Sequence, residues 1–104
     1  MSLRDDILAL RPETKAVETA VGPVWVRGMT IGLKDAIQRA AADGRPWRGI
    51  MLAHCVVDDA GVRLFTDDDI PKLHEVPAHM ERVIDAALEL SAFSNDEVEE
   101  LEKN

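Results

Sequence analysis

Residues 56–73 read VVDDAGVRLFTDDDIPKL and carry two successive signals for backbone structure, a reversal and then a helix start. Asp58-Asp59-Ala60-Gly61 is typical of a type I turn whose last residue, a glycine, takes the left-handed conformation. Such a turn would bring Val56-Val57 against Arg63-Leu64-Phe65. The stretch therefore predicts a short antiparallel pairing across Gly61.

The second half of the stretch predicts a helix. Thr66 is a suitable N-cap whose hydroxyl accepts a backbone N–H, and the aspartates at 67–69 fall in the first turn, where the helix dipole favours each by roughly 0.3–1 kcal/mol. Pro71 is expected to limit this helix, because it lacks an N–H and pushes Ile70 out of the helical region. In this interpretation six residues have a structural role alone, in the turn and at the start of the helix: Asp58, Gly61, Phe65, Thr66, Asp67 and Asp69.

Five aspartates in twelve positions also raise two chemical alternatives, a calcium loop and a catalytic pair of carboxylates. An EF-hand loop needs glycine in its sixth position and glutamate in its twelfth. Counted from Asp58 the sixth residue is Arg63, and counted from Asp67 the twelfth is Ala78, so both registers fail. A catalytic pair needs a pocket and apolar burial, whereas aspartates at a turn are expected to be solvated. We therefore expect no metal, no cofactor and no catalytic residue.

The other reactive side chains have structural interpretations as well. His54 lies in an apolar run and is expected to be a satisfied core residue. Its neighbour Cys55 points to another helical face, which disfavours a nucleophile–base pair and favours a buried thiol. His74 and His79 stand on either side of a proline and would share a metal only by an accident of the turn. The sequence thus predicts that this protein is not an enzyme.

The charge balance narrows the class of partner. The 104 residues include 12 Lys and Arg against 20 Asp and Glu, a formal charge of -8, which repels nucleic acid and anionic membranes. No apolar run approaches the roughly 20 residues that a membrane span needs. A single cysteine cannot form an internal disulfide, so the cytoplasm is the expected compartment. We expect one domain over residues 1–104, with 1–12 and 95–104 as its mobile ends.

Hydrophobic periodicity predicts an α+β fold that is mostly helical. Residues 14–21 alternate, and Gly22-Pro23 separates them from Val24-Trp25-Val26-Arg27, which indicates an N-terminal β-hairpin. Since a lone hairpin is marginal in water, one of its faces must pack on helices, with the tryptophan as a core anchor. Further helices are expected at about residues 3–10 with Ser2 as the cap, and at 31–42 with Thr30 as the cap and Gly44 as the stop. Others are expected from Trp47 onward, after Pro77, and after the capping box of Ser94 and Glu97.

Two features of these helices stay open. For residues 50–57 a buried strand competes with a central buried helix, because a short apolar run does not settle the period. Two apolar stripes are candidates for partner contact, with core packing as the alternative. They are the small residues Ala36, Ala40 and Ala41, and the pair Val98 and Leu101 in the last helix.

The order of these parts resembles the tail assembly chaperones of long-tailed bacteriophages, specifically their short, non-frameshifted product. The similarity is carried by residues 24–27 (VWVR), 30–37 (TIGLKDAI) and above all 55–69 (CVVDDAGVRLFTDDD), and it extends through 90–104. The resemblance implies a non-enzymatic protein of phage or prophage origin that binds the tape measure protein and keeps it soluble while the tail tube polymerises. It also implies self-association, the tail tube protein as a further partner, action in the host cytoplasm, and absence from the mature virion.

The alternative is a small acidic cytoplasmic adaptor or regulatory binding protein. It predicts a stable one-to-one complex and a gene among metabolic or signalling neighbours. The chaperone predicts a neighbouring tape measure gene, because its client must be made at the same time.

Overall fold

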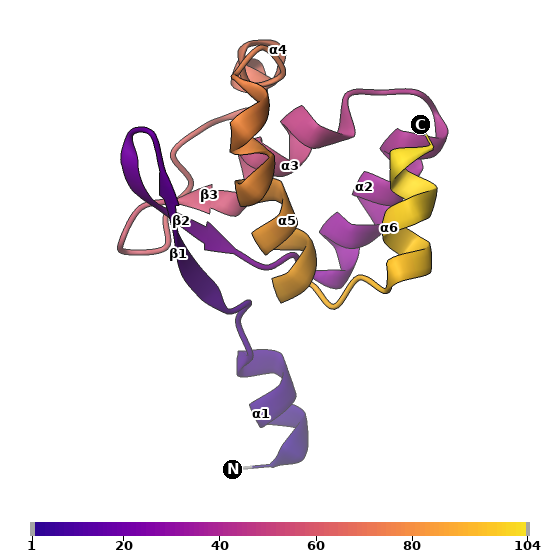
Figure 1. Ribbon diagram of the computed structural model, residues 1–104. Helices are drawn as coiled ribbons and strands as arrows, with labels where there is room; N and C mark the ends of the chain where they lie inside the picture. Colours follow the sequence, from indigo (N-terminus) through magenta and orange to yellow (C-terminus); the bar gives the residue numbers. More distant parts are fainter. Residues whose placement is uncertain (1, 104) are drawn as a thin grey trace.

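A three-stranded antiparallel sheet lies against a group of helices in the computed structural model, which describes residues 2–103 (Figure 1). This confirms the predicted α+β class, mostly helical with an N-terminal hairpin packed on the helices. The elements, in chain order, are α1 (Leu3–Ala9), β1 (Thr14–Thr19), β2 (Gly22–Arg27), α2 (Ile31–Ala42), α3 (Trp47–Cys55), β3 (Val56–Val57), the 3-10 turn η1 (Asp67–Asp69), α4 (Ile70–Leu73), the 3-10 turn η2 (Ala78–Met80), α5 (Glu81–Leu90) and α6 (Asn95–Glu102).

The hairpin reverses two residues earlier than the sequence predicted. The reversal lies at residues 20–21, and Gly22-Pro23, predicted to separate the strands, begins β2 opposite Thr19 and Glu18. The Thr19 hydroxyl accepts from the Val21 N–H at 3.2 Å and donates to the Gly22 carbonyl at 2.7 Å. Gly22 has φ +96°, a conformation that glycine adopts at little cost. This glycine therefore ends the reversal and is the first residue of β2.

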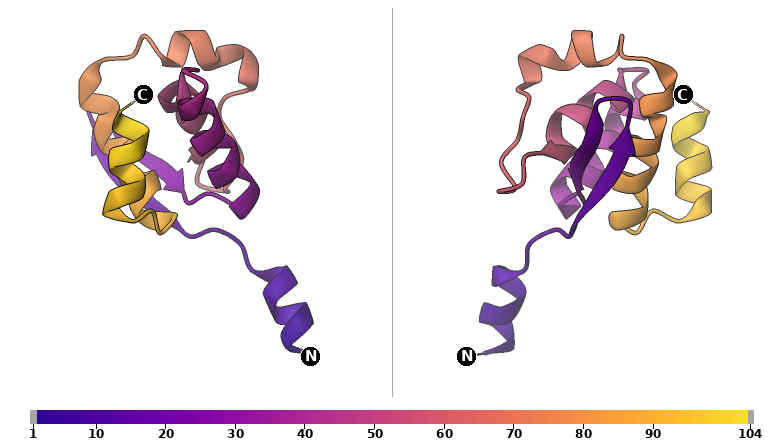
Figure 2. Two further views of the ribbon diagram at one scale, coloured as in Figure 1. Left: turned by 90° about the vertical axis from the view of Figure 1, so that its right-hand side faces the viewer. Right: turned by 60° about the vertical axis from the view of Figure 1, so that its left-hand side comes forward.

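Helix α3 is the centre of the core, and α2, α4 and α5 all pack against it. Helix α5 also covers β1 and β2, so the sheet lies on one side of the helices (Figure 2). The largest side chains that are fully buried come from five different elements: Ile37, Met51, Val26, Val57, Val83 and Cys55. Burial of the apolar core, to which these side chains belong, is the main favourable contribution to holding these short elements together.

The open question about residues 50–57 has a mixed answer. The chain is helical through Cys55 and then becomes strand β3, which pairs with β2 through Trp25↔Val57 and Val26↔Val56. The predicted reversal after β3 is confirmed, because Val57 bridges to Arg63 and Gly61 has φ +83°. The apolar run was ambiguous because it contains the end of a buried helix and a buried strand in succession.

The prediction for Pro71 was wrong. Ile70 is helical, with φ -51° and ψ -47°, and Pro71 occupies the first turn of α4. A first-turn residue has no partner for its N–H in any case, so proline is tolerated there. Helix α4 also lies close on α3, since a Cβ at Gly49 would be 3.1 Å from the Ile70 carbonyl oxygen.

The predicted capping box at the start of α6 is confirmed. The Ser94 hydroxyl accepts from the Glu97 N–H at 3.1 Å, and the Glu97 carboxylate accepts from the Ser94 N–H at 3.0 Å. The same carboxylate also forms an ion pair with Lys34 Nζ at 3.1 Å and accepts a hydrogen bond from the Gln38 side-chain amide at 3.1 Å, and both partners belong to α2. Glu97 therefore joins the cap of α6 to α2, and Leu101 anchors the helix at 2% exposure.

Replacing Glu97 by glutamine is expected to destabilise the protein at neutral pH, and progressively less as the pH falls from about 4.5 to 2. The Ser94 N–H and the Lys34 ammonium lower the pKa of Glu97 from 4.5 to about 2 in the folded chain. A carboxyl whose pKa is lower when folded stabilises above its unfolded pKa, and the contribution disappears as pH drops through the folded one. Urea unfolding of both proteins over this range measures the difference. Glu99→Gln on the exposed side of α6 is the control, and a difference that does not change with pH would refute the interpretation.

Helix α1 stands clear of the rest of the molecule in every view (Figures 1 and 2). Ser2 caps it by accepting from the Asp5 N–H at 3.2 Å, as the sequence predicted, and it ends at Ala9. None of its residues is buried. Its apolar side chains therefore face solvent, although the body they extend from is well packed.

Candidate binding groove

An apolar groove of about 320 Å³ lies beside the tip of the hairpin. Its lining comes from the hairpin turn, β2, β3 and the loop after it, from α3, and from the segment that runs from α4 to η2. The lining residues are all apolar: Val21, Pro23, Val24, Trp25, Leu52, Val56, Val57, Leu64, Phe65, Leu73, Val76 and Met80. Elements distant in sequence thus build one continuous hydrophobic surface.

Four side chains at this groove are unusually exposed for their type. Val21 is 85% exposed, Leu64 56%, Trp25 40% and Val76 36%. Trp25 was predicted to be a core anchor, and this was wrong: Val26, next to it on β2, is fully buried, and successive strand residues face opposite sides. Large apolar side chains grouped in this way are typical of a surface that binds another molecule.

The lining determines what the groove is able to bind. It contains no ionisable side chain, and so offers no general acid, nucleophile or metal ligand of its own. A dry cavity of about 150 Å³ holds a benzene molecule, so this groove has room for about two aliphatic side chains. Its chemistry fits apolar side chains presented from a helix or an extended segment.

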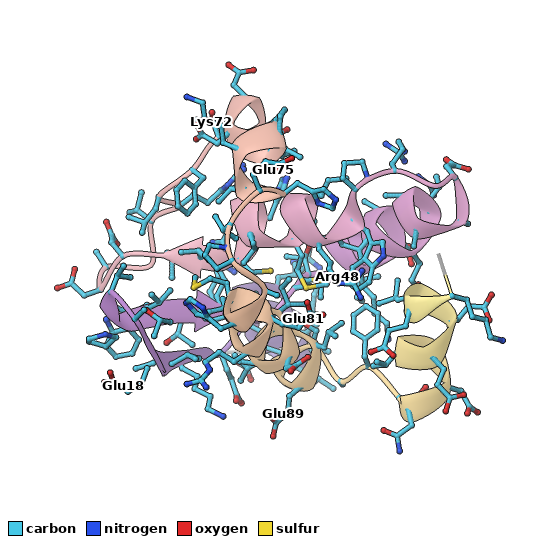
Figure 3. The ribbon with its side chains drawn as sticks, turned by 45° about the horizontal axis from the view of Figure 1, so that its top comes forward. Glu18, Arg48, Lys72, Glu75, Glu81 and Glu89 are labelled. Carbon is cyan, nitrogen blue, oxygen red and sulfur yellow. The ribbon has the colours of Figure 1, made fainter. Side chains whose placement is uncertain are left out.

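A second cavity of about 290 Å³ shares Leu52, Leu73, Val76 and Met80 with the groove. It is more polar, and its charged groups include Arg48 of α3 and Glu81 of α5, which point toward one another (Figure 3). Arg48 Nε lies 3.0 Å from the Glu81 carboxylate, and its guanidinium stacks 4.2 Å from the Trp47 ring. These groups serve to join α3 to α5.

Aspartates within residues 58–69 accept hydrogen bonds from backbone N–H groups and from neighbouring side chains. Asp58 accepts from the N–H groups of Ala60 at 2.8 Å and Val62 at 2.9 Å, which closes the turn. Asp69 accepts from the Thr66 N–H at 2.8 Å and completes a capping box at the acidic turn. Within residues 2–103 no group of three His, Cys, Asp or Glu side chains is arranged to hold a metal ion.

Replacing Asp58 by alanine is expected to lower the free energy of unfolding by about 1–2 kcal/mol, because two backbone donors lose their acceptor. Asp59→Ala is the matched control in the same turn, where the side chain is exposed, and it should change stability by less than about 0.5 kcal/mol. Chemical denaturation measures both. Equal effects of the two substitutions would show that the Asp58 hydrogen bonds do not hold the turn.

Asp67 joins two other side chains in a small cluster. Its carboxylate lies 3.1 Å from His54 Nε2 and 3.1 Å from the Arg63 guanidinium, and the hydrogen bond from Arg63 is the main cause of its lowered pKa. Burial and the charge of Arg63 lower the pKa of His54, so this imidazole is mostly neutral at pH 7 and donates a hydrogen bond. His54 is thus satisfied, although it is partly exposed rather than in the core. Arg63 also donates to the Ala53 carbonyl, which fixes the loop to α3.

Cys55 is buried beside this cluster, as predicted. Burial raises the pKa of its thiol to about 12, so it is protonated and a poor nucleophile at neutral pH.

The structure separates the five residues proposed for partner contact. Ala40 and Ala41 are each 1% exposed and Leu101 2%, so all three lie in the core. Val98 is partly buried against that core, and Ala36 alone is exposed. Sequence reasoning did not find the groove. The available signal was Val24-Trp25-Val26, where three successive apolar residues place apolar side chains on both faces of a strand.

No protein family, curated protein or solved structure matches this chain. Across residues 2–103 no helix has both the length and the apolar character that crossing a membrane requires.

Proposed function

We propose that this protein is a non-catalytic tail assembly chaperone of a phage or prophage, and that its apolar groove binds helical segments of the tape measure protein. The groove is the observation that carries the proposal. A chaperone of this kind needs an accessible hydrophobic surface on a stable scaffold, and the groove supplies one without any reactive group in its lining.

Two of the four segments that resemble this family line the groove. Val24 and Trp25 of the segment 24–27 line it, and so do Val56, Val57, Leu64 and Phe65 of the segment 55–69. The aspartates between them close the turn and cap the acidic 3-10 turn, which sets the position of Leu64 and Phe65. These two segments therefore form and support one surface, which favours a binding role for them.

The charge of the protein suits such a client. A formal charge of -8 keeps a complex with a hydrophobic partner soluble, and it favours a helix whose apolar stripe is flanked by lysine and arginine. We place this activity in the host cytoplasm during assembly, with release of the chaperone as the tail tube protein polymerises around the tape measure protein, so that the mature virion lacks it.

Co-expression tests the proposed function. We expect the large helical protein encoded next to this gene to be insoluble alone and soluble when the chain is present, and the two to purify together. The absence of a neighbouring gene for a long helical protein, or a neighbour whose solubility is unchanged, would contradict the proposal. A stable one-to-one complex with a cellular regulatory protein would instead support the adaptor.

A further inference from the structure

Helix α1 carries an apolar stripe with nothing beneath it. Leu3 and Ile7 are one helical turn apart on the same face, and Leu10 continues that face just beyond the last helical residue. These side chains are 75%, 56% and 72% exposed. An i, i+4, i+7 series of this kind is the pattern by which a helix anchors in a hydrophobic groove.

Side-chain hydrogen bonds at both ends of α1 favour its helical form, in which the stripe is continuous. Ser2 caps its first turn, and the Arg11 guanidinium donates to the carbonyls of Leu8 at 3.3 Å and Leu10 at 2.8 Å at its other end. Yet seven residues are too few for a helix to persist in water without tertiary contacts. The stable form of α1 is therefore one in which its stripe is covered.

Helix α1 does not contact the groove of its own chain. It joins the hairpin at Thr14, which pairs with Arg27, and none of its residues is among those that line the groove. Since α1 stands clear of the body in Figures 1 and 2, the surface that covers its stripe can come from another molecule.

We propose that α1 of one copy binds in the apolar groove of a second copy, and that two copies exchange these helices reciprocally. The segment from Ser2 to Arg11 holds two arginines and two aspartates, so it carries no net charge and approaches the strongly acidic body without like-charge repulsion. The groove accepts about two aliphatic side chains, which matches Ile7 and one neighbour from the stripe. The exchange covers both unpartnered apolar surfaces at once.

The exchange also regulates access to the groove. While α1 of a second copy occupies it, the groove is protected from non-specific association, and a client helix must displace α1 to bind. The exchange itself does not depend on the proposed function; only this competition rests on it.

Sedimentation velocity of the 104-residue protein without any client tests the exchange. We expect the wild type to form a dimer, and Ile7→Asp to weaken it about 100-fold, because burying one such side chain contributes roughly tenfold at each of two equivalent contacts. Ala9→Asp puts the same charge on the other side of α1 and should leave the dimer unchanged. Leu64→Asp in the groove should act like Ile7→Asp. A wild type that is monomeric at every concentration, or a dimer that persists in Ile7→Asp, would overturn the proposal.

Cross-linking identifies which chains are in contact. Ile7→Cys and Leu64→Cys proteins are mixed and treated with a short bifunctional maleimide, with Cys55 buried and unreactive in both. We expect a mixed dimer in the mixture, and no link within a single chain in the protein that carries both substitutions. A link formed only within single chains would show that α1 folds back on its own body. These measurements contain no client, so a negative result contradicts the exchange of α1 and does not bear on the co-expression test. A negative co-expression result contradicts the proposed function and does not bear on the exchange.

Discussion

Replacing Ile37 by alanine is expected to lower the free energy of unfolding by about 2–5 kcal/mol. Ile37 is fully buried at the middle of α2, in the same cluster as Met51 of α3 and Val83 of α5. Its truncation removes apolar area from the core and leaves a cavity that the surrounding helices fill only in part. Since a domain of this size is stable by roughly 5–15 kcal/mol, the variant should be near its limit of stability.

The matched control is Ile31→Ala in the same helix. Ile31 is 85% exposed, so the same change of side chain should alter stability by less than about 0.5 kcal/mol. Urea denaturation of the three proteins gives both differences. If the two substitutions had equal effects, α2 would not pack in the orientation described.

Replacing Leu64 by aspartate is expected to reduce binding of a helical client by at least about tenfold without unfolding the protein. Leu64 is more than half exposed, so the fold does not depend on its side chain, whereas a client seated in the groove would bury it. Loss of that burial costs about 1.5–3 kcal/mol, and the new carboxylate would be desolvated against apolar walls.

Val62→Asp separates the groove from a general effect of charge. Val62 is 60% exposed, lies two residues away in the same loop, and does not line the groove. Both variants have the same net charge, so any electrostatic effect on a basic client is shared. Calorimetric titration with a peptide from the client measures the dissociation constants. Equal affinities for Leu64→Asp and Val62→Asp would place the binding surface elsewhere.

The elements of this fold were predictable where local chemistry decides them. Thr30, Ser94 and Ser2 cap helices as their positions indicated, and Gly61 takes the left-handed conformation that ends the turn. The helix after Pro77 was predictable because its apolar residues recur at a single period. In these places the signal lies within one turn or one helix.

The groove was not predictable in the same way, because it exists only where four segments meet. Nothing in the local pattern of Leu64 or Val76 shows that they share a wall with Trp25 and Leu52. The small-residue stripe shows the same limit, because its pattern left core packing and partner contact open. Ala40 and Ala41 lie in the core, and the helices that α2 packs on include α3 and α6 of the same chain.

The most direct test of the central claim is an NMR titration of the ¹⁵N-labelled protein with a helical peptide from the tape measure protein that carries an apolar stripe. We predict that the largest amide shift changes fall in three segments, residues 21–25, 56–65 and 73–80, while α6 and the exposed face of α2 remain unchanged. Changes centred on α2 and α6, or no changes at all at saturating peptide, would contradict the assignment of the groove as the client site.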